Sequence, residues 1–179
     1  MQVIYELSTE PKFLSQYYEL REKCYRVDLK LATFDGSEEQ QDRTGHILIA
    51  RRLETCIGGA RIHNAASLLD TIPELELPSE NSCVWERFCV DPKIRSTELA
   101  RDFCSQLITH SRRLGFEYAV TLSSLLNARA YRQWHSALGV EFTISKKLHG
   151  IAAPQFAGLE HYLSFSTLQP DNQMLQMAA

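Results

Sequence analysis

Residues 82–124 constrain the fold of this chain more than any other segment. The strand-like stretch SCVWERFCV leads into Asp-Pro and a short polar loop, and a helix with apolar residues at helical spacing follows. A second strand, FEYAVTLSS, comes directly after the helix and is mostly apolar, which is typical of a central strand covered on both faces. This order predicts an α/β domain built around the two strands and the helix between them.

The loop before the helix is a candidate anion site. A helix that starts at the end of a strand presents backbone N–H groups without intrahelical partners, and its N-terminal dipole is positive. Loops that bring a phosphate close to such a helix end are usually rich in glycine. This loop reads Arg95-Ser96-Thr97-Glu98-Leu99-Ala100, which contains no glycine and carries an acid. The residues therefore leave open whether a phosphate binds there.

Further elements are predicted on both sides of this segment. Pro11 opens a helix over residues 11–27, and residues 28–44 read as a loop that can hold one short helix. A tight turn near Glu54 and Thr55 joins two strands of a hairpin. We expect strands over 2–7, 46–53, 56–63, 82–90, 116–123, 140–148 and 159–168, and helices over 96–114 and 127–138, the latter capped by Asn127. One domain would span residues 1–168, and residues 169–179 would form a frayed tail.

Composition argues against several classes of protein. The 179 residues carry a formal net charge of −3. A general nucleic-acid binder needs clustered Lys and Arg to hold phosphates, so this charge argues against that class. No apolar run is long enough to span a membrane, and the first residues lack the pattern of a signal peptide. The five cysteines are scattered, and neither they nor the histidines have the spacing of metal ligands. We therefore expect reduced thiols, a cytoplasmic location and no bound metal.

Three segments resemble the GNAT superfamily of N-acyltransferases. VDPKIRSTELA is similar to the acyl-donor motif of that family, Arg/Gln-x-x-Gly-x-Gly/Ala, and reads Arg95-x-x-Glu98-x-Ala100 here. NARAYRQWHSALGVEF is similar to its Asn-x-x-Ala…Tyr-x-x-x-Gly-Phe segment, and GGAR ends the predicted hairpin. The resemblance implies a mixed, mostly antiparallel sheet of six or seven strands with flanking helices. It also implies a V-shaped splay between strands 82–90 and 116–123, which would run parallel.

A finer resemblance is to the acyl-homoserine-lactone synthases and the related N-acyl amino acid synthases. The segments LREKCY, FDG, GGARI and ERFCVD are similar to motifs of that branch, although Leu31 stands roughly where the branch has tryptophan. This resemblance implies that a polar cluster orders the N-terminal loops and binds the acceptor, and its members here would be Arg21, Asp35, Arg61 and Arg87. The alternative for Arg61 and Arg87 is a solvated surface.

The resemblance also implies a donor site at the splay. The backbone N–H of Phe88 would face the thioester oxygen, and the backbone of Val90 would pair with the pantetheine amide. The residues implied at the donor are Phe88, Cys89, Val90, Arg95, Ser96, Thr97, Glu98, Leu99, Ala100, Arg101 and Asn127. Glu98 adds bulk and negative charge where the family has glycine. That favours a carrier-protein donor, or a donor site that has weakened, over tight binding of free CoA.

Three residues are candidates for proton transfer. Glu86 would share a strand face with Phe88 and Val90 by the period of two, and is our first candidate for the general base, with a structural ion pair to Arg61 or Arg21 as the alternative. Arg87 would then point to the opposite face. His135 stands where the family commonly has the tyrosine that protonates the leaving thiolate, unless it is a helix-face histidine without a role. Tyr131, one turn earlier, is the competing candidate.

The sequence thus predicts an N-acyltransferase that moves an acyl group from acyl-CoA, such as acetyl-CoA, or from acyl-carrier protein to the amine of a small molecule such as an amino acid. A GNAT-fold binding or regulatory protein is the alternative, and a protein-lysine acetyltransferase is a third. The expected partners are a small-molecule amine and, in one version, acyl-carrier protein. The sequence is compatible with a homodimer.

Overall fold

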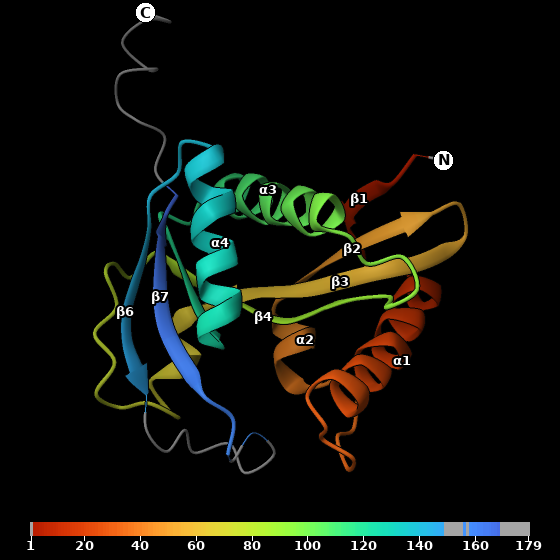
Figure 1. Cartoon of the computed structure of the whole chain (residues 1–179), viewed down its shortest axis with the longest axis horizontal. Coiled ribbons are helices and arrows are strands. Elements are labelled where there is room, and N and C mark those ends of the chain that lie inside the picture. Colours follow the sequence, from red (N-terminus) through yellow and green to blue (C-terminus); the bar gives the residue numbers. More distant parts are fainter. Residues whose placement is uncertain (1, 149–155, 157, 169–179) are drawn as a thin grey trace, which may run out of the picture.

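The computed structural model describes residues 2–148, 156 and 158–168 of the chain. Seven strands form one open sheet in the order β1-β2-β3-β4-β5-β7-β6, and all neighbouring strands are antiparallel except β4 and β5 (Figure 1). The strands are β1 (Ile4–Leu7), β2 (His46–Arg52), β3 (Thr55–Asn64), β4 (Ser82–Val90), β5 (Tyr118–Ser123), β6 (Phe142–Leu148) and β7 (His161–Thr167). The predicted mixed, mostly antiparallel sheet is confirmed, whereas the predicted tail over 169–179 lies outside the described residues.

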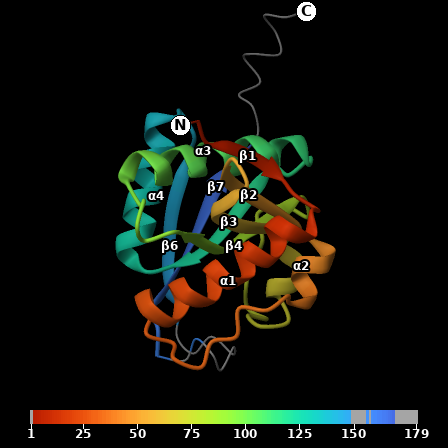
Figure 2. The same cartoon turned by 90° about the vertical axis from the view of Figure 1, so that its right-hand side faces the viewer.

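Helices cover both faces of the sheet (Figures 1 and 2). They are α1 (Pro11–Asp28), α2 (Gln40–Thr44), the 3-10 helix η1 (Ala65–Leu68), α3 (Thr97–Arg113) and α4 (Leu125–Ala137). α3 begins after Ser96, whose hydroxyl accepts a hydrogen bond from the Leu99 N–H at 3.1 Å. α4 begins after Ser124, whose hydroxyl accepts from the Asn127 N–H at 3.3 Å. The prediction that Asn127 caps α4 is therefore wrong, because Ser124 already does so from three residues upstream.

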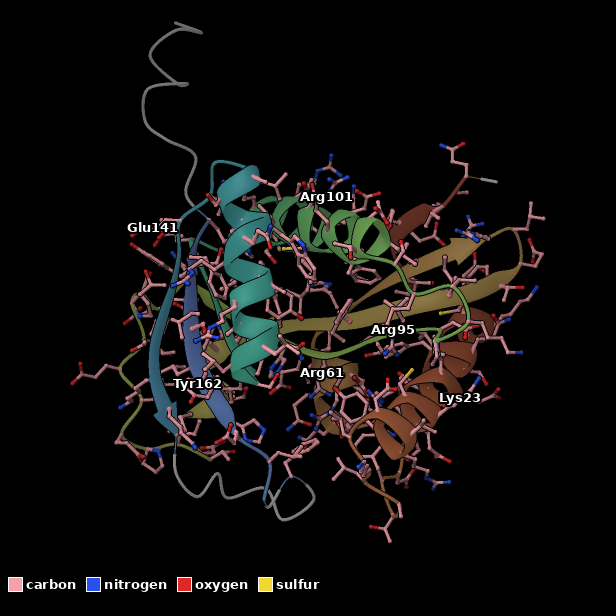
Figure 3. The ribbon with its side chains drawn as sticks, viewed as in Figure 1. Lys23, Arg61, Arg95, Arg101, Glu141 and Tyr162 are labelled. Atoms are coloured by element: carbon pink, nitrogen blue, oxygen red, sulfur yellow. The ribbon has the colours of Figure 1, made fainter. Side chains whose placement is uncertain are left out.

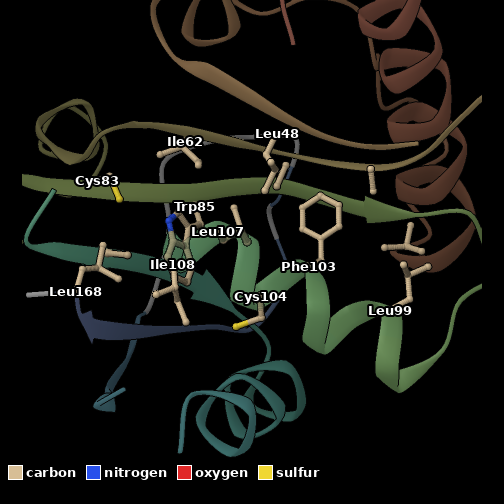
Figure 4. Close-up of a cluster of buried hydrophobic side chains, with 14 of the residues drawn as sticks. Leu48, Ile62, Cys83, Trp85, Leu99, Phe103, Cys104, Leu107, Ile108 and Leu168 are labelled. Atoms are coloured by element: carbon tan, nitrogen blue, oxygen red, sulfur yellow. The ribbon is translucent and has the colours of Figure 1, made fainter. Parts of the chain in front are cut away.

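The hydrophobic core has one layer on each face of the sheet. On one face, Phe103 and Leu107 of α3 pack against Leu48, Ile62 and Trp85 of the strands (Figure 4). On the other face, α1 packs its own apolar side chains against Ile47 and Ile49. Ile47, Leu48 and Ile49 alternate between the two layers, as side chains in a strand covered on both faces must.

β4 contains a β-bulge in its second half. Between the paired residues Glu86 and Cys89, both Arg87 and Phe88 lie opposite the single residue Ala60 of β3. Arg87 has a φ of +55°, in the left-handed region that few residues other than glycine adopt. The extra residue shifts the alternation of side chains between the two faces.

This shift corrects two sequence predictions. Phe88 and Val90 pack in the core layer under α3, whereas Glu86 bonds to Arg61 on the face of the sheet that α1 covers. Arg87 lies on that same face, where it pairs with Glu39. Glu86 therefore does not share a face with Phe88 and Val90, and Arg87 lies on the same side as Glu86 rather than opposite to it. The period of two fails here because the bulge inserts one residue.

β4 and β5 pair only over the first four residues of each strand. Ser82–Trp85 pairs in parallel with Tyr118–Thr121, and beyond these residues β4 stays on β3 while β5 stays on β7. The two strands therefore diverge where β4 carries its bulge. The predicted parallel splay between these strands is confirmed.

Buried ion pairs tie the segment between α1 and β2 to the sheet. The guanidinium of Arg21 is fully buried and donates to Asp42 at 3.0 and 3.2 Å and to the carbonyl of Gly36 at 2.9 and 3.2 Å. Arg61 of β3 donates to the same Asp42 at 3.0 Å and to Glu39 at 2.7 Å. The chain passes so close to α1 at Gly36 that a Cβ there would lie 2.4 Å from a side-chain atom of the helix. Charge pairing and one glycine thus fix this segment.

The network predicts a pH-dependent stability. Burial acts to raise the pKa of Glu39, but the hydrogen bonds and charges of Arg87 and Arg61 outweigh it and lower that pKa. In the unfolded chain this carboxyl takes up a proton below about pH 4.3, so the stability it contributes is present above that pH and is lost as the pH falls further. We expect Glu39→Gln to lower the free energy of unfolding by about 2 kcal/mol at pH 7, and the difference from wild type to narrow towards pH 3.

Denaturant unfolding at several pH values measures this difference. Glu54→Gln is the matched control, because Glu54 pairs with Lys12 at the exposed surface, where an ion pair contributes little. A difference between wild type and Glu39→Gln that is equal at pH 7 and pH 3 would contradict the prediction.

Candidate active site

A cavity of about 840 Å³ lies at the splay between β4 and β5. Side chains from α1 on one face of the sheet and from α4 on the other both line it, so it passes between the two strands. Its remaining walls come from the bulged half of β4, the ends of β3 and β5, η1 and the start of β7. A concave site of this size in which polar groups converge is a typical place for a small-molecule substrate.

The edge of β4 turns backbone groups towards the splay. The Asp91 N–H donates to the Ile57 carbonyl of β3 at 2.9 Å, so the backbone groups of its neighbour Val90 point away from β3. The Val90 carbonyl accepts from Arg95 Nη2 at 3.0 Å, and Cys24 Sγ lies 3.5 Å from it. Arg95 also pairs with Asp28 of α1 at 2.6 Å, and Figure 3 shows its side chain beside α1. The backbone of Val90 thus lies at the splay, and its carbonyl already has a partner.

The residues predicted at the donor divide into two groups. Phe88, Cys89, Val90, Arg95, Ala100 and Asn127 line the cavity. Ser96, Thr97, Glu98, Leu99 and Arg101 do not line it. Leu99 is buried in the core, and Glu98 and Arg101 are exposed on the outside of α3. The helical turn directs the Leu99 side chain into the core, so a contact of Leu99 with a donor could come only from its backbone, and that contact stays a prediction.

A cluster of alternating charges forms the wall of the cavity below α1. Arg61 Nη2 lies 2.5 Å from Glu86 Oε2, and His63 Nε2 lies 3.1 Å from the same oxygen. The guanidinium of Arg87 donates twice to Glu39, at 3.0 and 3.0 Å from Nε and Nη2. All five side chains line the cavity, and Figure 3 shows Arg61 in the interior of the molecule. Each positive group therefore faces a carboxylate.

The predicted acceptor residues are only partly brought together. Arg61 and Arg87 line the cavity, whereas Arg21 lies behind them with its charge paired to Asp42. Asp35 is exposed and accepts a hydrogen bond from the Ser37 N–H at 2.8 Å, so it closes a turn outside the cavity. The prediction that Asp35 faces the acceptor is wrong for this reason.

Glu86 is held in its charged form. Burial acts to raise its pKa, but the hydrogen bond with His63 and the charges of Arg61 and Arg87 outweigh it, and the pKa lies well below its usual range. A carboxylate that binds protons so weakly is a poor general base near neutral pH. The ion pair with Arg61, the alternative that the sequence left open, is the geometry found.

Of the two candidate acids, only Tyr131 lines the cavity. His135 is fully buried, its Nδ1 lies 2.7 Å from the Tyr131 carbonyl oxygen, and its ring packs near Trp85 and Phe142. Burial lowers the pKa of His135 to about 4. The placement of His135 at the thiolate is therefore corrected, because its ring belongs to the core. Burial also raises the pKa of Tyr131, which keeps its hydroxyl protonated.

Several cavity residues escaped the sequence analysis, above all His63 and Ser67. His63 follows Arg61 by two residues on one strand, and residues at that spacing share a face. That spacing could have predicted His63 beside Arg61 in the cavity. Within the described residues no group of three or more metal-ligating side chains occurs. In the same part of the chain, no helix is both long and apolar enough to cross a membrane.

Comparisons with known proteins agree with this geometry. The model of the acetyltransferase (GNAT) family matches residues 10–139, which is more than half of the chain. No curated protein sequence matches the chain significantly.

Solved structures share the fold at low sequence identity. The AHL synthase LasI is 15% identical with a TM-score of 0.71, and the match covers 97% of this chain and 93% of that one. BjaI, a CoA-dependent acyl-homoserine lactone synthase with SAM and isopentyl-CoA, is 13% identical with a TM-score of 0.69, over 92% of this chain and 79% of that one. The yncA protein of Salmonella typhimurium with its cofactor acetyl-CoA is 16% identical with a TM-score of 0.63, over 95% and 96%. The family match and the shared fold together mean that this chain belongs to the GNAT acetyltransferase family, a family of acyltransferase enzymes.

Proposed function

We propose that this chain transfers an acyl group from a thioester to the amine of a small molecule. The observation that carries the proposal is the cavity at the splay, which has the backbone edge of β4 on one side and the charged cluster on the other. Fixed backbone dipoles polarise a thioester carbonyl without reorganisation as charge develops. Charged and hydrogen-bonding side chains orient a polar acceptor. The two walls therefore suit the two substrates of an acyl transfer.

The reaction consists of one attack and two proton transfers. The amine nitrogen attacks the thioester carbonyl carbon, so that a C–N bond forms and the C–S bond breaks, while the amine loses one proton to a base on the acceptor side. The Phe88 N–H at the bulge would polarise the carbonyl, and the Tyr131 hydroxyl would protonate the leaving thiolate and regain its proton from solvent. Glu86 lines the acceptor side, where its charge would orient the amine and balance Arg61.

Acyl-CoA and acyl-carrier protein both remain in the proposal as donors. The bound acetyl-CoA of yncA and the bound isopentyl-CoA of BjaI support a CoA thioester. The glycine-free loop with its exposed Glu98 supports a carrier protein, whose surface contacts replace part of the grip on the pyrophosphate. Assays with acetyl-CoA, with longer acyl-CoA and with acyl-carrier protein, read by release of the free thiol, distinguish the donors.

We propose a small amine as the acceptor. If this amine also carries a carboxylate, that carboxylate competes with carboxylates of the protein for the arginines of the cavity. The three arginines that line the cavity already face carboxylates, Arg61 with Glu86 and Glu39, Arg87 with Glu39, and Arg95 with Asp28. A panel of amines with and without a carboxylate tests this point. Loss of thiol release with every amine and every donor would overturn the proposed function.

A binding protein without turnover is the second candidate. The observation in its favour is the Arg95 side chain on the Val90 carbonyl, which occupies a group that the donor would use. Mass spectrometry of the purified protein separates the two candidates, because an unmodified donor bound in the presence of amine without thiol release identifies the binding protein.

Tyr131→Phe tests the proposed acid. Removal of the hydroxyl leaves the ring in place, so we expect kcat to fall by about 10²-fold while the dissociation constant of the donor is unchanged. Steady-state kinetics and calorimetry measure the two quantities. Tyr118→Phe is the matched control, because Tyr118 lies on β5 outside the cavity lining. An unchanged kcat in Tyr131→Phe would remove Tyr131 from the mechanism.

Glu98→Gln tests the charge at the start of α3. The side chain is exposed in the first helical turn, where it repels a phosphate that approaches the helix N-terminus. We expect the affinity for CoA to rise about two- to fivefold at low salt, and the gain to vanish at high salt because ions screen exposed charges. Calorimetric titration measures it. Glu19→Gln, on the outside of α1, is the control, and an equal gain in both variants would contradict a local effect.

A further inference from the structure

Three cavity residues form a continuous hydrogen-bonded chain, of which the proposed mechanism uses only Glu86. Ser67 Oγ of η1 lies 3.1 Å from His63 Nδ1 of β3, and His63 Nε2 lies 3.1 Å from Glu86 Oε2 of β4. All three side chains line the cavity, and Ser67 is half-buried whereas His63 is buried. A hydroxyl, an imidazole and a carboxylate in this order are the parts of a nucleophile–base–orienting-acid arrangement.

The carboxylate determines which nitrogen of His63 carries hydrogen. Glu86 stays ionised, because its partners hold its pKa well below the usual range, and an ionised carboxylate only accepts hydrogen bonds. His63 Nε2 must therefore carry a hydrogen to bond to Glu86. In the neutral imidazole Nδ1 is then the acceptor, and the Ser67 hydroxyl is the donor that faces it.

Ser67 has a second partner that suits the other protonation state. Its Oγ also lies 3.1 Å from the Asn64 carbonyl oxygen. When His63 is protonated at both nitrogens, Nδ1 donates to Ser67 Oγ, and the hydroxyl turns its own hydrogen to Asn64. Both protonation states are thus fully hydrogen-bonded without a movement of any heavy atom. A histidine with a purely structural role needs partners for one state only.

We propose that Ser67 and His63 form the relay that removes a proton from the acceptor amine, with Glu86 as the orienting group. The inference rests on the proposed acyl transfer. The amine gives a proton to Ser67 Oγ, the Ser67 hydrogen passes to His63 Nδ1, and the imidazolium that forms donates to Glu86 through Nε2. After the transfer, His63 returns the proton to solvent through Ser67. Ser67 is the group that touches the substrate, and His63 acts through it.

The charges around His63 fit this role. Glu86 of β4 contacts its Nε2 directly, and Arg61 of its own strand contacts the same Glu86 oxygen. One contact further away lie Glu39 and Asp42, which bond to Arg61, and Arg87, which bonds to Glu39. The charge that contacts His63 directly is thus negative, and Arg61, which contacts the same Glu86 oxygen, opposes complete transfer of the proton to Glu86.

Ser67→Ala and Ser67→Thr form the matched pair that tests the relay. Alanine removes the hydroxyl and should lower kcat about tenfold or more, with the KM for the donor unchanged, whereas threonine keeps the hydroxyl and should retain most of the rate. The acid limb of the kcat/KM pH profile should shift in Ser67→Ala and be absent in His63→Gln. Ser105→Ala on α3, outside the cavity lining, should behave as wild type.

Imidazole nitrogen resonances give a readout that does not need activity. We expect the neutral ring of His63 in the Nε2–H form, and a changed Nδ1 resonance in Ser67→Ala, because that variant lacks the hydroxyl that donates to Nδ1. An Nδ1–H form, or equal rates and pH profiles in Ser67→Ala, Ser67→Thr and wild type, would overturn the relay. A wild-type protein that acylates no amine would overturn the proposed function instead, so the two failures are distinguishable.

Discussion

The division of the β4 side chains between the two faces of the sheet at the cavity depends on one extra residue in that strand. The bulge places Arg87 at a positive φ, which costs about 1–2 kcal/mol for a residue other than glycine. Two contacts hold it there, because the buried Tyr17 hydroxyl donates to the Arg87 carbonyl at 2.9 Å and the guanidinium forks onto Glu39. The extra residue turns Phe88 and Val90 to the α3 side of the sheet, while Glu86 and Arg87 lie on the α1 side, and β4 parts from β5 beyond Trp85.

The charged cluster meets a structural requirement before it can serve chemistry. Buried charges are tolerated only when they are paired, and removal of one partner is more costly than removal of the pair. Three arginines and three carboxylates pair with one another. Asp42 lies between Arg21 and Arg61, Glu39 lies between Arg61 and Arg87, and Glu86 pairs with Arg61. Because the charges balance, a neutral or zwitterionic acceptor disturbs the network less than a net anion does. A proton released by an acceptor in this cluster can be taken up by His63, whose ring contacts the carboxylate of Glu86.

The sequence predicted the architecture because apolar patterns specify it. The predicted positions of side chains were wrong where contacts between residues distant in the sequence determine the direction of a side chain. Strand 82–90 and its parallel partner follow from their composition and order, but the bulge that puts Phe88 and Val90 on the face opposite to Glu86 interrupts the period of two and cannot be read from it. His135 has the spacing of a catalytic residue, yet the core between α3 and α4 takes up its ring. The roles of His63 and Ser67 follow from contacts in space, because Glu86, the residue that links them to the site, is 23 positions away from His63 in the sequence.

The Arg95 side chain decides whether the backbone of Val90, where we propose that the donor binds, is open or closed. In the described state it donates to the Val90 carbonyl, so a pantetheine amide that pairs there must displace it. Displacement leaves the guanidinium paired with Asp28, and its side chain is 43% exposed, so no buried unpaired charge results. The cost is therefore one hydrogen bond near the surface, about 1 kcal/mol, and the incoming amide replaces it. Since so small a cost does not disable the site, the contact is compatible with turnover, and the balance of the observations favours an acyltransferase over a protein that only binds its donor.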